Sequence, residues 1–265
     1  MLGIGTIGRH LIEAIRAGRA GAYRLEAIAD RPALESELQA LSAALGVPYL
    51  TDPLGLLGYR PFVLVEAASQ DALRKCGVKT LQSGAHLMAM SVGALTDGDF
   101  ATDLLGAARR ADRRVVVPSG AIGGLDALLA ARQGDLHEVS LVTTKPPRAL
   151  AGAPFFVEHP TDLDAIASAT TIFEGSVADA ARLFPANLNV AAALSLAVGA
   201  KAVHVRIVAD PTAGQNMHEI VARGDFGEMR LRFVNEPSSN PRTSRLALYA
   251  AVAALRQLDE PLQFA

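Results

Sequence analysis

Three glycines near the start of the chain have the spacing of a phosphate-binding loop. Gly3, Gly5 and Gly8 form the pattern G-x-G-x-x-G, with Thr6 and Ile7 between the last two glycines. In this pattern the first glycine makes a tight turn, the second lets the backbone approach a pyrophosphate, and the third permits close packing of the following helix. The N-terminus of that helix then faces the phosphates. We therefore predict that these five residues bind a dinucleotide.

Asp30 has the position expected of an acid that holds the ribose of that dinucleotide. It ends an apolar segment and follows Gly8 by about 20 residues, the interval typical of this role. A carboxylate there favours NAD over NADP, because it repels a 2′-phosphate. Arg31 directly follows and could pair with that phosphate, so the use of NADP stays open.

The segment before the glycine loop is short. Only Met1 and Leu2 precede Gly3, whereas the loop normally follows a strand at the centre of the sheet. Loss of that strand would leave backbone groups unpaired on two neighbouring strands, at a cost above the ~5–15 kcal/mol that stabilises a domain. We therefore expect that the first strand is truncated or that the start was assigned too late. This expectation includes an apolar segment upstream.

Apolar segments around the loop predict an α/β fold in the first half of the chain. Strand-like and helix-like segments alternate there, which indicates parallel βαβ units. We expect strands at 25–30, 62–66, 85–90 and 114–118, and helices at 10–16, 33–45 and 97–111. Each strand ends in small or polar residues, where open α/β sheets bind their ligands.

The second half alternates apolar and polar residues, which predicts a mainly antiparallel sheet with one exposed face. We expect strands at 136–144, 202–209, 217–221 and 228–234, and helices at 177–183, 188–198 and 242–258. The predicted fold class is therefore a Rossmann dinucleotide-binding domain, formed by 1–119 and 240–265, with an inserted α+β domain at 120–239. We assign substrate binding, catalysis and oligomerisation to the inserted domain.

Composition narrows the classes of function. A net charge of −2 gives no reason to expect a nucleic-acid partner. The longest apolar run, 190–200, is shorter than the ~20 residues of a membrane span, so no membrane partner is expected. Cys76 is the single cysteine, which rules out an internal disulfide and fits a cytoplasmic location. His, Cys, Asp and Glu do not cluster at ligand spacings, so no metal site is expected.

Several stretches of the second half resemble one enzyme family. They are PSGAIGGLDAL at 118–128, TTKPP at 143–147, FEG at 173–175, FPANLNVAAAL at 184–194, N-x-H-x-I at 216–220 and NPRTS at 240–244. Together they resemble the L-aspartate dehydrogenase family over nearly the whole chain. The combination is far more specific than the glycine loop.

The resemblance implies an oxidoreductase that uses NAD or NADP to convert L-aspartate to iminoaspartate. Iminoaspartate then hydrolyses to oxaloacetate and ammonia or enters NAD biosynthesis. The family's catalytic histidine matches His218, and its cofactor contacts match Ala121 and Asn187. The resemblance also implies oligomers, with a homodimer as the expected form.

The chemistry of the residues agrees with this role for His218. Hydride transfer from the Cα of an amino acid needs a neutral amine, so a base must take or orient a proton. Histidine has the side chain whose unperturbed pKa, ~6.5, lies nearest working pH. Among the six histidines of the chain, the polar flank of Gln215 and Asn216 favours His218 as general acid/base.

The two carboxylates of aspartate need cationic or helix N-terminal partners. Lys145 sits at a predicted strand end before two prolines and is a candidate contact, with a solvated loop lysine as the alternative. Arg242, Thr243 and Ser244 open the last predicted helix, where they bind an anion or simply cap the helix. Asn216 completes the predicted substrate contacts.

Two other functions stay open. One is another oxidoreductase of similar layout, such as an amino-acid or homoserine dehydrogenase-like or a dihydrodipicolinate reductase-like enzyme. The other is a catalytically silent dinucleotide-binding protein, against which the presence of His218 and Lys145 argues.

Overall fold

The computed structural model describes the chain except for residues 186–187, 200–201, 241–242 and 263–265. Contacts divide it into two compact units, each treated by itself below. Unit 1 comprises Met1–Pro118 and Leu248–Gln263, and unit 2 comprises Ser119–Ala247 with Phe264–Ala265. Residues 240–247 thus group with unit 2, whereas the sequence assigned them to the first domain. The functional roles of the two domains stay a prediction.

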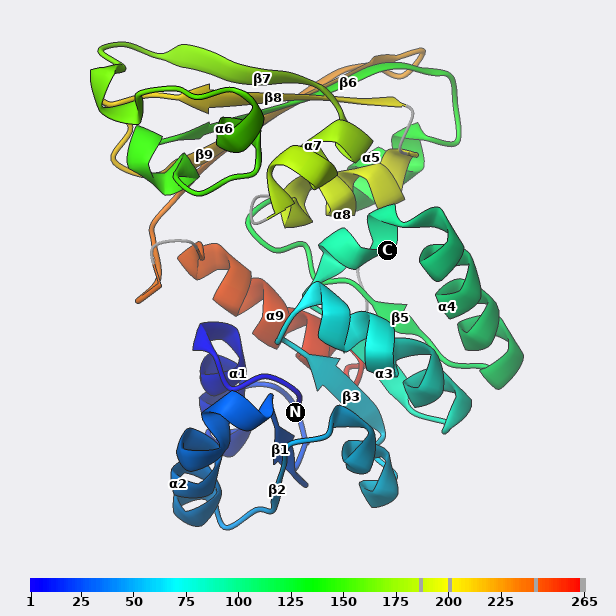
Figure 1. Ribbon diagram of the computed structural model, residues 1–265. Coiled ribbons are helices and arrows are strands. Elements are labelled where there is room, and N and C mark those ends of the chain that lie inside the picture. Colours follow the sequence, from blue (N-terminus) through cyan, green and yellow to red (C-terminus); the bar gives the residue numbers. More distant parts are fainter. Residues whose placement is uncertain (186–187, 200–201, 241–242, 263–265) are drawn as a thin grey trace. The chain divides into compact units, whose positions relative to one another are not determined.

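Unit 1 is built on a parallel sheet in the α/β arrangement expected from the sequence (Figure 1). Its strands are β1 (Ile28–Ala29), β2 (Tyr49–Leu50), β3 (Val63–Glu66), β4 (His86–Ala89) and β5 (Val115–Val116). β1 pairs with β2, and β4 lies between β3 and β5. The residue that connects these two groups of strands is Leu2, which bridges Ala29 on one side and Glu66 on the other.

The place of the first strand is taken by the first residues of the chain, and an apolar segment upstream of them stays a prediction. Leu2 donates its backbone N–H to the Val65 carbonyl oxygen at 2.8 Å, and Gly3 donates to the Ala29 carbonyl oxygen at 2.8 Å. The start of the chain thus supplies the last residues of the central strand and pairs with both neighbours. A cleft of about 530 Å³ lies beside Met1, with 22–27 and 59–65 among its walls.

Five helices pack in unit 1: α1 (Thr6–Arg16), α2 (Glu35–Leu45), α3 (Gln70–Gln82), α4 (Gly98–Ala111) and α9 (Arg245–Gln257), whose last turns belong to this unit. Leu11 of α1 and Leu255 of α9 share an apolar core with Val65 and Met88 of the sheet. The Asp97 side chain caps α4 by accepting from the Phe100 N–H. These contacts fix the helices against the strands whose ends form the site.

Helix α3 was not predicted, and its packing explains why the sequence hides it. Gly77 interrupts the apolar pattern at mid-helix, yet a Cβ there would lie 2.9 Å from Leu104 Cδ1 of α4, so the glycine permits close helix packing. Cys76 is fully buried in the same helix, and burial raises the pKa of its thiol to about 12. This agrees with a structural rather than a reactive cysteine.

Unit 2 contains a five-stranded sheet in the order β10-β9-β6-β8-β7 (Figure 1). The strands are β6 (Leu136–Lys145), β7 (Thr170–Ser176), β8 (Val203–Ala209), β9 (Asn216–Gly224) and β10 (Gly227–Asn235). Three pairings are antiparallel and the β6–β8 pairing is parallel, so the sheet is mainly antiparallel, as predicted. β7 is an addition to the predicted strands.

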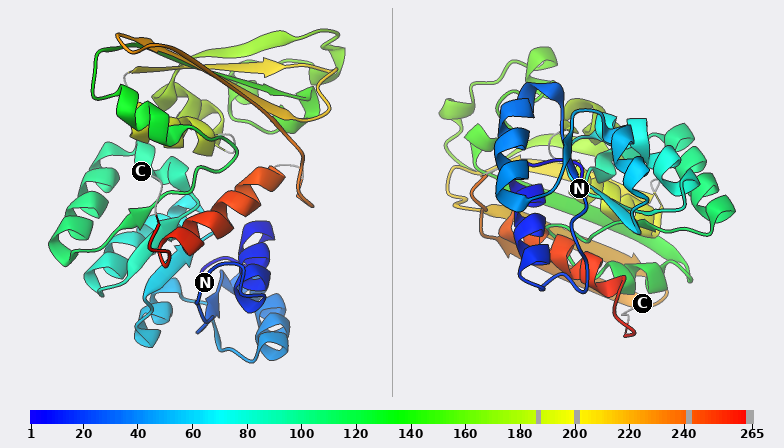
Figure 2. Two further views of the ribbon diagram at one scale, coloured as in Figure 1. Left: turned by 180° about the vertical axis from the view of Figure 1, so that it is seen from behind. Right: turned by 90° about the horizontal axis from the view of Figure 1, so that it is seen from below.

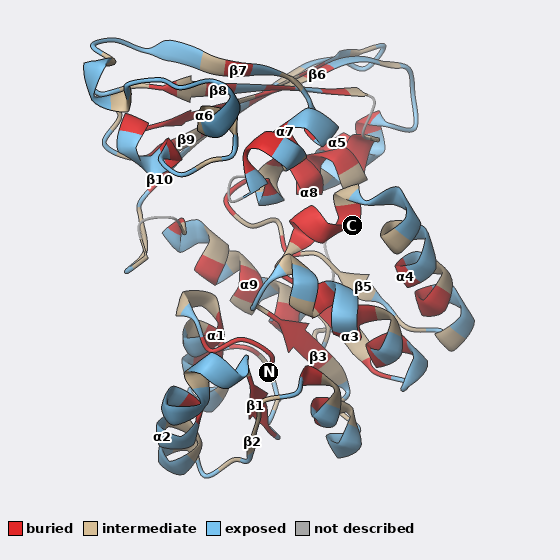
Figure 3. Ribbon diagram, in the orientation of Figure 1, coloured by how far each residue is buried: buried red, intermediate tan, exposed pale blue. Residues whose placement is uncertain are grey.

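The helices of unit 2 are α5 (Leu125–Ala131), α6 (Phe155–Glu158), α7 (Val177–Leu183) and α8 (Asn189–Val198). Figure 1 and Figure 2 show α5, α7 and α8 on one face of the sheet. Alternate residues such as Val205 and Ile220 are buried toward these helices, while Arg206 and Glu219 on the opposite face are exposed (Figure 3). Burial on one face follows from the two-residue period of a strand.

Among the described residues, no helix combines the length and the apolar character needed to cross a membrane.

Candidate active site

The glycine loop of unit 1 has a distinct environment at each glycine. Gly3 adopts a φ of +95°, and a Cβ there would lie 2.4 Å from the Ala67 carbonyl oxygen. A Cβ at Gly8 would lie 2.0 Å from the Gly3 carbonyl oxygen. At Gly5 no atom of the described residues lies within 4 Å of such a carbon. Gly3 and Gly8 therefore allow tight backbone packing, and Gly5 leaves room beside the helix N-terminus.

The first residues of α1, Thr6 and Ile7, follow Gly5 directly. Because Gly5 has no side chain that could cap the helix, the N–H groups of the first turn remain available for an anion. This space and these donors fit the pyrophosphate of a dinucleotide. Binding of the dinucleotide by these residues remains a prediction.

Asp30 lies beside the glycine loop, at the end of β1. Its Oδ2 accepts a hydrogen bond from the Ile4 N–H at 2.8 Å, and its Oδ1 accepts from the Arg31 N–H at 2.8 Å. The two bonds fix the direction of the carboxylate. Each oxygen has a second lone pair, so the group can still accept from the hydroxyls of a ribose.

In unit 2, His218 faces the helix-covered side of the sheet. It is 4% exposed, and it pairs in register with Thr143 of β6 and Phe233 of β10. Its Nδ1 lies 3.0 Å from Thr143 Oγ1. Burial, with a further contribution from the charge of Lys145, lowers the pKa of His218 to about 3. The imidazole is therefore neutral near pH 7, with one ring nitrogen held by a hydroxyl.

Lys145 is the last residue of β6 and shares the face of Thr143, because the two lie two residues apart along the strand. It is 7% exposed, and burial lowers the pKa of its amine to about 8. The amine thus keeps its charge at pH 7 and loses it at mildly alkaline pH. A buried cation beside a neutral imidazole suits a substrate that combines an amine with carboxylates.

The ends of β9 and β10 hold two buried asparagines opposite each other, Asn216 and Asn235. Asn235 Nδ2 donates a hydrogen bond to the Ala121 carbonyl oxygen at 2.9 Å. The carboxamide thereby fixes the stretch from which a cofactor contact was predicted. Asn216 lies two residues before His218 on the same face of β9.

Thr243 and Ser244 lie in the turn that leads into α9. The Ser238 N–H donates to the Thr243 carbonyl oxygen at 2.8 Å, and Ser244 pairs with Pro237 in a single antiparallel bridge. Ser244 is buried. These contacts support a structural role for the turn, and substrate binding by the two residues stays a prediction.

Asn187, a predicted cofactor contact, and Arg242 lie outside the described residues. Three arginines of unit 2 form exposed ion pairs: Arg148 with Asp164, Arg206 with Glu174, and Arg232 with Glu219. In the part of the chain that the structure describes, no group of three or more His, Cys, Asp or Glu could hold a metal ion.

Sequence reasoning did not single out three buried polar residues, Thr143, Asn235 and Glu66. Thr143 could have been found, since it precedes Lys145 by two residues in an alternating strand and so shares its face. Asn235 and Glu66 end strands, which is a weaker signal. Each makes a hydrogen bond to a residue distant in the sequence, Asn235 to Ala121 and Glu66 to Ser91, and these residues become neighbours only in the folded chain.

Comparison with known families matches both halves of the chain. Residues 126–258 match the family described as aspartate dehydrogenase, C-terminal. Residues 3–118 match the family described as homoserine dehydrogenase, NAD binding domain. The N-terminal match confirms the Rossmann-type domain, and its description confirms the prediction of a nicotinamide cofactor.

Individual proteins give the same result. An L-aspartate dehydrogenase of Methanocella arvoryzae is 42% identical, with 99% of this chain and 97% of that protein covered. An L-aspartate dehydrogenase of Cupriavidus necator is 41% identical, covering 96% and 95%. The crystal structure of aspartate dehydrogenase from Thermotoga maritima is similar with a TM-score of 0.76 and 28% identity, covering 100% of this chain and 97% of that one.

A homoserine dehydrogenase from Thiobacillus denitrificans shares the fold at a TM-score of 0.62, with 14% identity, over 97% of this chain and 72% of that one. At that identity the likeness concerns the fold alone. The matches at 41% and 42% identity run over nearly the full length of both chains, and a family profile covers the half that carries His218. The chain therefore belongs to the L-aspartate dehydrogenase family.

Proposed function

We propose that this enzyme is an L-aspartate dehydrogenase with His218 as its general acid/base. The observation that carries the proposal is the buried group of His218, Thr143 and Lys145 on one face of the sheet. The product is iminoaspartate, which then hydrolyses to oxaloacetate and ammonia or feeds NAD biosynthesis. Family membership and the printed names of the relatives support this substrate.

The glycine loop fits a nicotinamide dinucleotide. Gly5 leaves an open space at the start of α1, and Asp30 is fixed next to it. We propose that Gly3, Gly5, Thr6, Ile7, Gly8 and Asp30 hold the cofactor, with Ala121 and Asn187 as further contacts. NAD is the preferred form, because the carboxylate of Asp30 disfavours a 2′-phosphate. When bound, the cofactor accepts the hydride that leaves the Cα of aspartate.

The role of His218 follows from its charge and its hydrogen bond. A neutral imidazole can take the proton that the substrate ammonium must lose before a C=N bond forms. In the tautomer whose Nδ1–H donates to the Thr143 hydroxyl, the lone pair of Nε2 can take that proton from the substrate. The hydroxyl thereby fixes the orientation of the ring.

Lys145 links substrate binding to the basicity of His218. Its charge disfavours protonation of the imidazole in the free enzyme. A substrate carboxylate paired with the Lys145 amine would compensate that charge, so the pKa of His218 would rise when aspartate binds. We propose that aspartate thus increases the basicity of the residue that receives its proton. Asn216, Thr243 and Ser244 complete the proposed substrate contacts.

Replacement of His218 tests the assignment. We expect His218→Ala to lower kcat by ~10²–10⁴-fold and to leave NAD affinity near that of the unaltered enzyme. Thr143→Val should lower kcat by about tenfold, because the ring loses the hydrogen bond that fixes its orientation, and Thr143→Ser should restore it. The measurement is aspartate-dependent formation of reduced NAD and NADP, followed by absorbance.

His204→Ala is the matched control, since His204 lies in the same sheet but pairs with Glu174 on the exposed face. Full activity of His218→Ala would refute the proposed role. A panel containing homoserine and other amino acids tests the substrate: turnover of these but not of aspartate would refute the assignment. Gel filtration and fractionation test the proposed homodimer and cytoplasmic location.

A further inference from the structure

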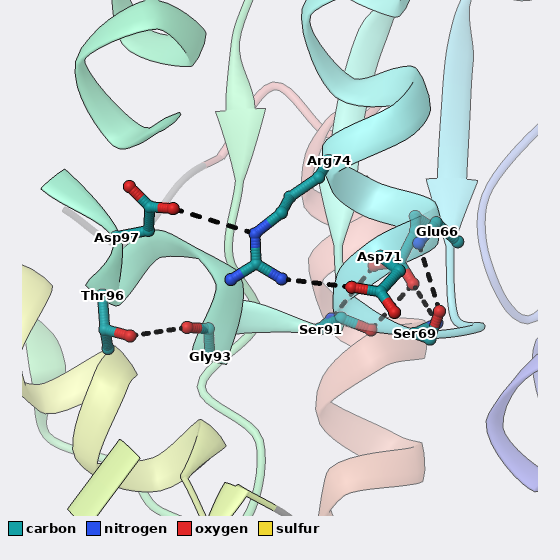
Figure 4. Close-up of polar contacts among 9 residues, drawn as sticks. Glu66, Ser69, Asp71, Arg74, Ser91, Gly93, Thr96 and Asp97 are labelled. Atoms are coloured by element: carbon teal, nitrogen blue, oxygen red, sulfur yellow. Dashed lines mark hydrogen bonds and ion pairs between the residues drawn. The ribbon is translucent and has the colours of Figure 1, made fainter. Parts of the chain in front are cut away.

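Glu66 is a fully buried acid at the end of β3, in unit 1, that accepts four hydrogen bonds (Figure 4). Its Oε1 accepts from the Ala68 N–H at 2.8 Å, the Ser69 N–H at 3.0 Å and the Ser91 hydroxyl at 2.8 Å. Its Oε2 accepts from the Ser91 N–H at 3.0 Å. Burial raises the pKa of Glu66, and the four donated bonds oppose that effect.

These donors belong to two different loops. Ala68 and Ser69 follow β3, whereas Ser91 follows β4. The backbone also connects the ends of these two strands, because the Met90 N–H donates to the Glu66 carbonyl oxygen at 2.9 Å. One carboxylate therefore joins the loops at the carboxyl ends of two neighbouring parallel strands.

The first of these loops also packs against the glycine loop. The Ala67 N–H donates to the Leu2 carbonyl oxygen at 2.8 Å, and a Cβ at Gly3 would lie 2.4 Å from the Ala67 carbonyl oxygen. A shift of 67–69 would therefore displace the turn at Gly3. Open α/β sheets bind their ligands at the carboxyl ends of the strands, which is the edge where these three segments meet.

We propose that Glu66 is a positioning residue for the dinucleotide, holding the loops after β3 and β4 in the arrangement that the glycine loop requires. The inference rests on dinucleotide binding by the glycine loop, which is part of the proposed function. A carboxylate suits this position because an ionised acid only accepts hydrogen bonds, and each of its partners here is a donor.

Substitutions of Glu66 test the proposal. Glu66→Gln keeps the size but turns an N–H group toward an N–H donor of one loop. Glu66→Asp keeps the charge but is one methylene too short to reach both loops. We expect each variant to weaken the binding of oxidised and reduced NAD equally, by about tenfold. The KM for aspartate at saturating NAD should stay unchanged, which separates positioning from a general loss of structure.

Thr80→Val is the matched control. Thr80 is fully buried in α3, and its hydroxyl donates to the Cys76 carbonyl oxygen at 2.9 Å, within the helix. It should lower Tm without changing the dissociation constant of NAD. If the Glu66 variants do not fold, Ser91→Ala removes one donor only and should weaken NAD binding by about two- to threefold.

The outcomes are distinguishable. NAD dissociation constants of folded Glu66 variants within twofold of the unaltered enzyme would overturn the inference and leave the proposed function intact, as would an unchanged constant for Ser91→Ala. Weaker binding of oxidised NAD alone would also overturn it, because that pattern indicates a charge effect rather than positioning. Absence of any dinucleotide binding by the unaltered enzyme would overturn the proposed function as well.

Discussion

Lys145 and His218 show how burial, as the main cause, can prepare two ordinary side chains for chemistry. Loss of solvation destabilises the charged form of each, so the pKa of both falls. The two consequences differ, because their usual pKa values differ by several units. His218 becomes neutral throughout the physiological range, whereas Lys145 retains its charge up to about pH 8.

Lys145 should therefore set the alkaline limit of aspartate binding. As pH rises through about 8, the amine loses its proton and can no longer pair with a carboxylate, so kcat/KM for aspartate should fall. Lys145→Arg should shift this fall to higher pH, because a guanidinium stays charged. Lys145→Met should raise the KM for aspartate by about 10–100-fold. The check is the pH profile of kcat/KM, and an alkaline limb that does not move in Lys145→Arg would contradict the assignment.

At the scale of single residues, the sequence identified the charged and titratable side chains of the site better than their hydrogen-bond partners. His218 and Lys145 were named from motifs, and the structure brings them close enough for their charges to interact. Thr143, Asn235 and Glu66 were missed because their roles depend on hydrogen bonds across strands and loops. Motif spacing carries no information about such contacts before the register of the sheet is known.

The glycine loop is the element in which sequence and geometry correspond most closely. Each glycine has its own reason to lack a side chain: a left-handed turn at Gly3, an open approach at Gly5 and close backbone packing at Gly8. The first and third reasons concern the fold. The second leaves room for a ligand to approach, so these sites should respond differently to the same substitution.

Gly5→Ala should separate cofactor binding from stability. Gly5 has a φ of −70°, which alanine tolerates, and the added methyl meets open space, so Tm should change little. NAD affinity should fall by about 10–100-fold, because the methyl occupies the approach of the pyrophosphate. Gly8→Ala should lower stability by ~1–3 kcal/mol, because its methyl would collide with backbone.

Thermal unfolding with and without NAD measures both effects. Gly98→Ala is a control, since this glycine begins α4 and a Cβ there also meets open space. Gly98→Ala should leave both NAD affinity and Tm near their original values. Unaltered NAD affinity in Gly5→Ala would argue against a phosphate contact at this residue.

Among the other elements, helix α7 was predicted with its observed bounds, Val177–Leu183. The predicted strand at 25–30 is reduced to Ile28–Ala29. Residues before Ile28 read as a strand by composition, but they line the cleft beside Met1. A strand needs a hydrogen-bonded neighbour as well as apolar residues, and single-sequence patterns report only the second condition.

At the scale of the whole chain, the buried amine of Met1 should make stability depend on pH. The terminal amine donates to the Ala27 carbonyl oxygen at 2.9 Å, and burial lowers its pKa to about 5. In the unfolded chain the amine has its usual pKa near 8, so unfolding takes up a proton between about pH 5 and 8. Stability should consequently fall as pH is lowered from 8 to 5.

Addition of four apolar β-branched residues before Met1 should extend the central strand into the cleft beside this residue. We expect Tm to rise by about 2–6 °C, because the burial of two or three side chains exceeds the entropy lost on ordering them. The dependence of stability on pH between 5 and 8 should weaken, because the amine leaves the interior. A Gly-Ser-Gly-Ser extension is the control, and equal Tm values for the two extensions would rule out this use of the cleft.

The rate at which Cys76 is alkylated should report the local unfolding of unit 1. Its thiol is fully buried and holds its proton firmly, so an alkylating reagent reacts with it only when α3 leaves the sheet. Because the chain has a single cysteine, labelling reports the opening of unit 1 and not that of unit 2. The labelling rate thus measures how often this region unfolds locally. A ligand that slows labelling must bind the closed form of unit 1.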